Sequence, residues 1–270
     1  MPKFFAPDYE RDEQGRIRFP KDDKYRREIF KFWDRLDISM SEHPAKANIY
    51  LVKAIVEYVS EMDETVMDIM SGTGTILIAA LMGRKVVCIE LEEPYQNMIE
   101  EAIKDIEAIA PGAADAVTLI PGDCAKVLPL QIADHVIFSP PYTNIMKKKT
   151  MVKLDVEMMA PGLLTYSKSP ENIGNLSEFM YHQKMEQVYR KVLDSLPPNG
   201  TLTIIIKDHI EKGERVYLGN RAERDCIKTG FVLDLHEQWL PPGSAYASFM
   251  RARGDMVVDE EDVIVLRKPL

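Results

Sequence analysis

The sequence predicts an α/β protein with a doubly wound, mostly parallel sheet of seven strands, an antiparallel final strand and a helical N-terminal extension. Two observations carry this prediction. Short apolar segments alternate with segments of helical periodicity over most of the 270 residues. The apolar segments are also continuous, which is typical of parallel strands covered by helices on both faces. A chain of this length can bury one such core, so we expect a single domain.

The first half of the chain contains the first three strands and the helices around them. Residues 1–19 are polar, and we expect them to be extended or partly disordered. The pattern YRREIFKFWDRL predicts an amphipathic helix over 24–36, and a second helix opens at Pro44. The alternation that follows predicts strands at 65–70, 85–91 and 116–123, with helices at 75–83 and 93–110.

The second half contains the fourth strand and the elements after it. We predict a strand at 134–142, a helix at 179–196 and a fifth strand at 200–208. Nothing helical clearly separates the last two apolar segments, 230–240 and 259–268, so they are expected to pair as an antiparallel hairpin.

Residues 143–177 lack clear periodicity, and unstructured loops of that length in compact domains are usually functional or disordered. We expect them to form a lid over the substrate. The single domain then has four parts: an extension (1–62), a cofactor half with the catalytic loop (63–142), the insertion (143–177) and the C-terminal half of the sheet (178–270).

Composition restricts the class of protein. The net charge of −9 argues against a protein that coats nucleic acid non-specifically. No apolar run is long enough to span a membrane, and the charged start predicts no signal peptide. The three cysteines are scattered and show no zinc-ligand spacing, so we expect a cytoplasmic protein without a metal. Basic residues cluster near the N-terminus, at 147–153 and at 215–228, and each cluster alone is typical of a solvated surface.

A glycine-rich turn follows the first predicted strand in the sequence DIMSGTGT. Gly72 and Gly74 let the backbone pass close to a ligand, and Asp68 precedes them. Glu90 closes the second strand, where a carboxylate can accept hydrogen bonds from ribose hydroxyls, and Asp123 follows the third. A lone GxG turn is often only a tight connection, but acids at successive strand ends favour a nucleotide site.

Two kinds of cofactor compete for this turn. A dinucleotide site requires GxGxxG, and Ile78 stands at the third glycine position, so that match is poor. An adenosyl cofactor has no pyrophosphate and does not need the third glycine. We therefore predict a site in which Asp68 lies near the methionine moiety and Asp123 bonds the adenine amino group.

The segment Ser139-Pro140-Pro141-Tyr142 ends the fourth predicted strand. Two adjacent prolines stiffen this loop and leave the Ser139 hydroxyl and a proline carbonyl free as acceptors. Two acceptors can hold the hydrogens of an exocyclic amine and turn its lone pair toward a methyl donor. Tyr142 offers a flat face for a base taken out of its helix. A rigid turn without chemistry is the alternative.

These motifs resemble those of the nucleic-acid amino-methyltransferases, whose members carry a (Ser/Asn/Asp)-Pro-Pro-(Tyr/Phe) loop. The resemblance also covers HPAKAN (43–48), similar to the family's HPxxKP element, together with DIMSGTGT (68–75) and VVCIELEEPY (86–95). It implies a class I, Rossmann-like methyltransferase fold and S-adenosylmethionine as cofactor. It departs at Ile69, Met70 and Ala47, where the family has Pro, Phe and Pro, and the motif order is the unpermuted one.

The resemblance assigns residues to roles. The catalytic residues are Ser139, Pro140, Pro141 and Tyr142. The cofactor pocket is expected to contain His43, Lys46, Asp68, Met70, Gly72, Gly74, Thr75, Glu90, Asp123 and Cys124.

The serine version of the loop is typical of enzymes that methylate the 4-amino group of cytosine. We predict a cytidine in RNA, such as ribosomal RNA, because little chain is left for a DNA-reading element and RNA can be chosen by shape. The substrate-binding residues are then Asn144, Lys147, Lys148, Lys149 and Lys153, close behind Tyr142. A cytosine in DNA, a protein glutamine amide and a non-enzymatic RNA-binding scaffold are the alternatives, and the intact motifs disfavour the last.

Overall fold

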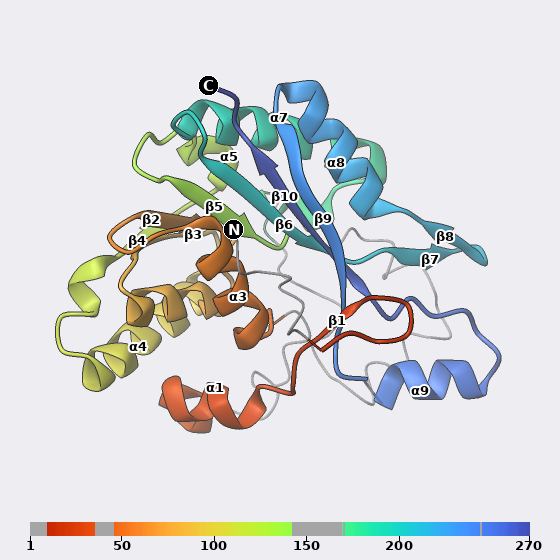
Figure 1. Cartoon of the computed structure of the whole chain (residues 1–270), viewed down its shortest axis with the longest axis horizontal. Helices are drawn as coiled ribbons and strands as arrows, with labels where there is room; N and C mark the ends of the chain where they lie inside the picture. Colours follow the sequence, from red (N-terminus) through yellow and green to blue (C-terminus); the bar gives the residue numbers. More distant parts are fainter. Residues whose placement is uncertain (1–9, 36–45, 142–168, 170, 244) are drawn as a thin grey trace.

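The computed structural model describes residues 10–35, 46–141, 169, 171–243 and 245–270 (Figure 1). The strands in this part of the chain are β1 (Ile17–Arg18), β2 (Thr65–Asp68), β3 (Lys85–Glu90), β4 (Val117–Pro121), β5 (His135–Phe138), β6 (Thr201–Ile206), β7 (His209–Glu211), β8 (Glu214–Val216), β9 (Val232–Leu240) and β10 (Glu261–Arg267).

Eight of these strands form one sheet in the order β1-β9-β10-β6-β5-β2-β3-β4. The strands from β6 to β4 are all parallel, and β10 is antiparallel to both of its neighbours. This is the mostly parallel sheet with an antiparallel final strand that the sequence predicts. Ser139, Glu90 and Asp123 follow or end three of the parallel strands, so they reach the same edge of the sheet.

Helices cover both faces of the sheet (Figure 1). One face packs under α1, η1, α3, η2 and α4, and the other under α5, η5, α7 and α8. The bounds are α1 (Asp23–Ile29), η1 (Lys31–Arg35), α3 (Ile49–Val59), η2 (Thr75–Met82), α4 (Glu93–Ile109), η3 (Ala114–Ala116), α5 (Cys124–Val127), η5 (Ile173–Asn175), α7 (Glu178–Ser195), α8 (Leu218–Thr229) and α9 (Ala245–Ala252).

Burial on both faces explains why the strands read as continuous apolar runs. In β3, Val86 and Cys88 join the cluster on one face, whereas Val87 and Ile89 join the cluster on the other. All six residues of β6 are buried. Each strand therefore needs an apolar side chain at every position rather than at every second one.

The N-terminal extension differs from the prediction in three respects. Ile17–Arg18 forms an eighth strand, parallel to the end of β9, within the part predicted only as extended. The helix predicted over 24–36 is two short helices, because the backbone leaves helical geometry at Phe30 (φ −101°, ψ 79°). The next helix begins at Ile49 rather than near Pro44, since Asn48 accepts hydrogen bonds from the N–H groups of the first turn and so caps it.

In the C-terminal half, the sequence analysis missed α8, α9 and the hairpin of β7 and β8. The buried side of α8 is formed by Leu218, Ala222 and Cys226, and two of these are too small to make the helical period obvious beside the charges around them. The last two strands pair antiparallel as predicted, but α9 lies between them in the chain. The predicted 75–83 helix is present as the 3₁₀ helix η2.

The extension is anchored to the core by Asp105 of α4. One carboxylate oxygen accepts a hydrogen bond from the Phe32 backbone N–H at 2.7 Å, and both residues are buried. Asp105→Ala is expected to lower the free energy of unfolding by about 1–3 kcal/mol, because it leaves that N–H buried without an acceptor. Urea titration followed by circular dichroism measures the change.

Glu101→Ala is the matched control on the same helix. Glu101 pairs with Arg35 and Lys104 at the surface, where its side chain is 42% exposed, and such pairs contribute at most about 1 kcal/mol. An Asp105→Ala protein as stable as the parent would show that this hydrogen bond does not hold the extension in place.

Candidate active site

The turn after β2 is shaped by two glycines. Gly72 (φ 50°) and Gly74 (φ 77°) both have left-handed backbone geometry, which favours glycine over any residue with a Cβ. A Cβ at Gly74 would also lie 3.1 Å from Ile99, whereas a Cβ at Gly72 would meet no atom within 4 Å. Gly74 therefore allows helix packing, and Gly72 borders open space.

The carboxyl group of Glu90 holds this turn against the end of β3. Oε2 accepts a hydrogen bond from the Gly72 N–H at 2.6 Å, and Oε1 accepts one from the Glu92 N–H at 2.9 Å. Glu90 is only 6% exposed, and burial raises its pKa to about 7, with the charge of Glu92 adding to the effect. Burial likewise raises the pKa of Asp68 to about 7, and the nearby Glu90 contributes.

Asp123 and Cys124 begin α5 beyond the end of β4. Asp123 caps this short helix by accepting a hydrogen bond from the Ala125 N–H at 2.8 Å, and it is buried. Cys124 is a buried free thiol whose pKa burial raises to about 12, so it is not a nucleophile at neutral pH.

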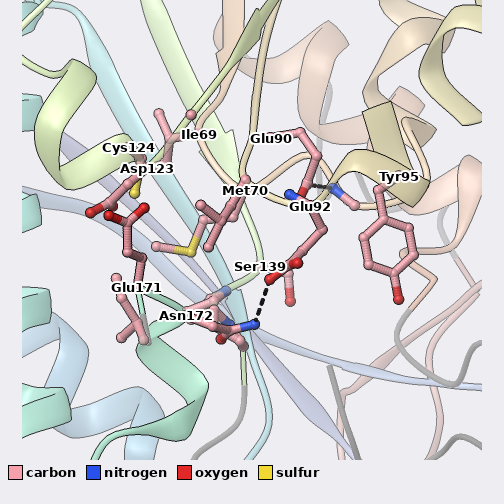
Figure 2. A pocket seen from close by; sticks show the side chains of 16 residues that line it. Ile69, Met70, Glu90, Glu92, Tyr95, Asp123, Cys124, Ser139, Glu171 and Asn172 are labelled. Carbon is pink, nitrogen blue, oxygen red and sulfur yellow. Dashed lines mark hydrogen bonds between the residues drawn. The ribbon is translucent and has the colours of Figure 1, made fainter. Parts of the chain in front are cut away.

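Ser139, Pro140 and Pro141 follow β5 and face the same space as Glu90 and Asp123. Ser139 and Pro141 are partly exposed, and Pro140 is buried. Together these segments line one open cleft (Figure 2). Its lining comprises Ile69, Met70, Gly72, Glu90, Leu91, Glu92, Tyr95, Gly122, Asp123, Cys124, Ser139, Pro140, Pro141, Glu171, Asn172 and Ile173.

Residues 171–173 line the cleft, and the sequence analysis assigned them no role beyond the insertion. Asn172 is buried, and its side-chain amide donates a hydrogen bond to Glu92 Oε1 at 3.2 Å, as Figure 2 shows. Glu171 forms an ion pair with Lys126. Nothing in the sequence around Asn172 points to Glu92, because the two residues meet only when η5 packs beside the start of α4.

The cleft is acidic. Glu90, Glu92, Asp123 and Glu171 line it, and no Lys or Arg stands among its described lining residues. It therefore suits a ligand that carries positive charge, and it lacks the cations that commonly accompany a bound phosphate.

Four residues predicted for the cofactor pocket do not line this cleft: Lys46, Asp68, Gly74 and Thr75. Asp68 and Gly74 belong to the glycine turn but do not line the cleft. Thr75 Oγ1 accepts a hydrogen bond from Arg26 at 3.0 Å, and the Lys46 ammonium lies 4.5 Å from the centre of the Trp33 ring.

Arg26 is the centre of this second group, and the sequence analysis gave it no role. It is 3% exposed, and besides Thr75 it donates to the Ala47 carbonyl and to Asp22. It thus ties the extension to the start of η2. Burial lowers the pKa of Lys46, and the Arg26 charge lowers it further.

Several predicted residues lie outside the described part of the chain: His43, Tyr142, Asn144, Lys147, Lys148, Lys149 and Lys153. Their roles stay predictions. Within the described residues, no group of three His, Cys, Asp or Glu side chains is arranged to hold a metal ion. No helix there combines the length and apolar character needed to cross a bilayer.

Comparison with known proteins finds similarity to methyltransferases in sequence and in fold. Residues 5–101 match the sequence model of a family described as DNA methylase. No curated protein is similar enough in sequence to count as a match.

Solved structures share the fold at low sequence identity. TrmN from Thermus thermophilus is 17% identical over 82% of this chain, with a TM-score of 0.50, and the chain spans only 49% of its length. A SAM-dependent methyltransferase from Methanosarcina mazei is 13% identical over 80% of this chain and 97% of its own (TM-score 0.51). The glycopeptide N-methyltransferase MtfA, solved with S-adenosylmethionine, is 12% identical over 85% and 90% (TM-score 0.51). The fold is that of class I methyltransferases.

The raised pKa of Glu90 has a consequence for stability. In the folded protein the carboxyl keeps its proton up to about pH 7, but in the unfolded chain it loses the proton near its ordinary value of 4.5. The folded state binds more protons between these values, so the free energy of unfolding falls as pH rises through this window. Glu90→Gln should remove a contribution on the order of 3 kcal/mol to the fall between pH 5 and pH 8.

Urea titrations at pH 5 and pH 8 test this. Glu107→Gln is the control: its pKa is lowered by the Gly112 and Ala114 N–H groups, so it titrates below this range and should leave the difference unchanged. A Glu90→Gln protein with the same difference as the parent would show that Glu90 is ionised across the whole range.

Proposed function

We propose that this chain, whose residues 5–101 match the DNA methylase family and whose fold is that of class I methyltransferases, methylates an exocyclic amino group of a nucleic-acid base with S-adenosylmethionine. The convergence of Ser139 and Pro140 with Glu90 and Asp123 on one cleft carries the proposal. It puts the acceptors for an amine beside the acids suited to an adenosyl group.

The cleft fits this cofactor in shape and in charge. Gly72 leaves room for a ligand where a Cβ would project into it, and the carboxyl groups of the lining favour the cationic sulfonium and ammonium groups. A dinucleotide would place its pyrophosphate against these acids, which disfavours it. MtfA, which has the same fold, was solved with S-adenosylmethionine bound.

We place the parts of the cofactor by the donors and acceptors around them. Glu90 would accept hydrogen bonds from the ribose hydroxyls, since each oxygen keeps a free lone pair beside its N–H partner. Asp123 would accept from the adenine amino group. The methionine part would then follow the Met70–Gly72 turn, with its sulfonium toward Ser139.

When bound, S-adenosylmethionine supplies an electrophilic methyl group on a sulfonium. The Ser139 hydroxyl and the Pro140 carbonyl would accept hydrogen bonds from the two amine hydrogens and make the nitrogen more tetrahedral. The nitrogen lone pair then forms the new N–C bond as the C–S bond breaks. The nitrogen, positively charged at that point, releases one proton to water. Tyr142 would hold the base by stacking.

The serine version of the loop favours the 4-amino group of cytosine, and we propose a cytidine in RNA, such as ribosomal RNA, as the target. The sheet and its helices account for most of the described residues, and no separate element for reading a major groove stands among them. RNA offers unstacked bases that can be selected by shape. A cytosine in DNA is the second candidate, because the matching family is described as DNA methylase.

Ser139→Ala is expected to lower kcat about 10- to 100-fold, because it removes one acceptor that orients the nitrogen in the transition state. The Kd for S-adenosylmethionine should stay close to that of the parent. Ser139→Asn restores an acceptor oxygen and should recover part of the rate. Single-turnover methyl transfer and calorimetry measure the two quantities.

Ser60→Ala is the control, since that hydroxyl donates to the Val56 carbonyl at the end of α3, away from the cleft. If Ser139→Ala kept the parent rate, or lost cofactor affinity to the same degree as rate, the loop would not be the catalytic one.

Methyl transfer from radiolabelled S-adenosylmethionine should label ribosomal subunits or total RNA, and nucleoside mass spectrometry should identify a 4-amino-methylated cytidine. The physical reason is that a base in an unpaired RNA loop enters the cleft without the cost of breaking a duplex. Labelling confined to DNA would reject the RNA target in favour of the second candidate, and labelling of neither would reject the proposed function.

A further inference from the structure

Beside the cleft lie two segments that belong to neither the cofactor site nor the catalytic loop. The first is the start of α7, five residues beyond Ile173 of the cleft lining. The second is the β7–β8 hairpin, which follows β6 at the carboxyl edge of the sheet and leads into α8 (Figure 1). Since β6 is the parallel neighbour of β5, this hairpin starts next to the strand that carries Ser139.

The two segments adjoin each other. α7 packs against α8, and His182 of α7 is buried close enough to Arg221 of α8 for that charge to help lower the His182 pKa. Glu178 of α7 is also close enough to His209 of β7 for its charge to raise the His209 pKa. The start of α7, the hairpin and the start of α8 are therefore neighbours in the fold.

This surface exposes large apolar side chains. Phe179 is 68% exposed, Met180 48% and Tyr217 58%. From Ile173 to Phe179 the chain can extend at most about 20 Å, so the exposed ring is close to the cleft. Single exposed apolar residues are common, but three on segments that adjoin one another indicate a surface that contacts a partner.

Tyr217 is held ready for stacking. The Arg215 guanidinium lies 5.2 Å from the centre of its ring and covers one face. That guanidinium is fixed by ion pairs to Asp208 (2.8 Å) and Glu260 (2.6 Å), so it cannot easily swing away. The ring is still more than half exposed, which leaves it accessible to a second flat group, and little conformational entropy remains to be lost on binding.

A second arginine follows Tyr217 in the chain. Arg221 lies one helical turn along α8, where its N–H donates to the Tyr217 carbonyl, and its side chain is 39% exposed. Its ion pair with Asp225 is long, at 3.7 Å. The guanidinium can therefore turn to an anionic group beside the ring at small cost.

We propose that Phe179, Met180, Arg215, Tyr217 and Arg221, here named the stacking surface, bind unpaired nucleotides that flank the target base. The identity of the partner rests on the proposed function. Aromatic faces accept any unstacked base, and an adjacent guanidinium matches a phosphate. Because the carboxylates of Glu178, Asp208 and Asp225 offset the two guanidinium charges of Arg215 and Arg221, stacking rather than charge supplies the affinity.

Fluorescence anisotropy with a labelled single-stranded oligoribonucleotide tests the proposal without requiring turnover. Phe179→Ala and Tyr217→Ala should each weaken binding about 5- to 100-fold, the worth of one stacked base. Arg221→Ala should reduce the slope of log affinity against log salt by about 0.7, the value for one phosphate contact on a single strand. The same sequence as a duplex should bind more weakly than the single strand, since its bases are not free to stack.

Matched controls lie at the opposite edge of the sheet. Ile132, 49% exposed before β5, controls for the loss of an exposed apolar side chain. Arg267, 40% exposed and paired with Asp234, controls for the loss of a half-exposed arginine. Ile132→Ala and Arg267→Ala should bind the oligoribonucleotide like the parent, and all variants should keep the parent's circular dichroism and S-adenosylmethionine affinity.

The outcomes separate this proposal from the proposed function. Methyl transfer with a parent-like KM in Phe179→Ala and Tyr217→Ala overturns the stacking surface and leaves the function intact. Weakened oligoribonucleotide binding in a protein that methylates no nucleic acid supports the surface and overturns the function. Variants that change the sedimentation coefficient, but not oligoribonucleotide affinity, would make the surface an interface between copies of the chain and overturn the proposal.

Discussion

The site depends on one buried carboxyl group. The side chain of Glu90 accepts hydrogen bonds from Gly72 in the turn after β2 and from Glu92 at the start of α4. Its backbone carbonyl accepts a further one from Gly122, in the turn after β4. Three connections that leave neighbouring strands are thereby fixed around a single residue. This residue therefore links the three connections that border the cleft.

Burying this carboxyl group costs free energy. Burial raises the pKa of both the Glu90 and the Asp68 carboxyl groups to about 7, and the charge of Glu90 adds to the rise at Asp68. A fold selected only for stability would place apolar groups there. Hydroxyl donors or a positive charge in the cleft would relieve that cost, so the arrangement favours a cofactor that brings both.

The cleft is lined by two segments that are far apart in the sequence. The turn, Glu90, Asp123 and Ser139 all come from residues 68–139, and each follows or ends its own strand. Asn172, near the end of the insertion, lines the cleft and reaches Glu92 through its amide. The surface of Phe179 and Tyr217 continues outward from there. The proposed contacts to flanking nucleotides would thus come from a different part of the chain than the proposed contacts to the cofactor and the target amine.

The sequence by itself determined seven strands of the main sheet, the glycine turn and the Ser139 loop. These features are local: a continuous apolar run, a positive-φ glycine or two adjacent prolines restrict the backbone wherever the rest of the chain lies. Only the tertiary structure decided that Asn172 meets Glu92, that Arg26 supports Thr75 and that α8 is a helix with a buried side of small residues. Contacts between residues far apart in sequence depend on how whole elements pack, and no short pattern of residues records them.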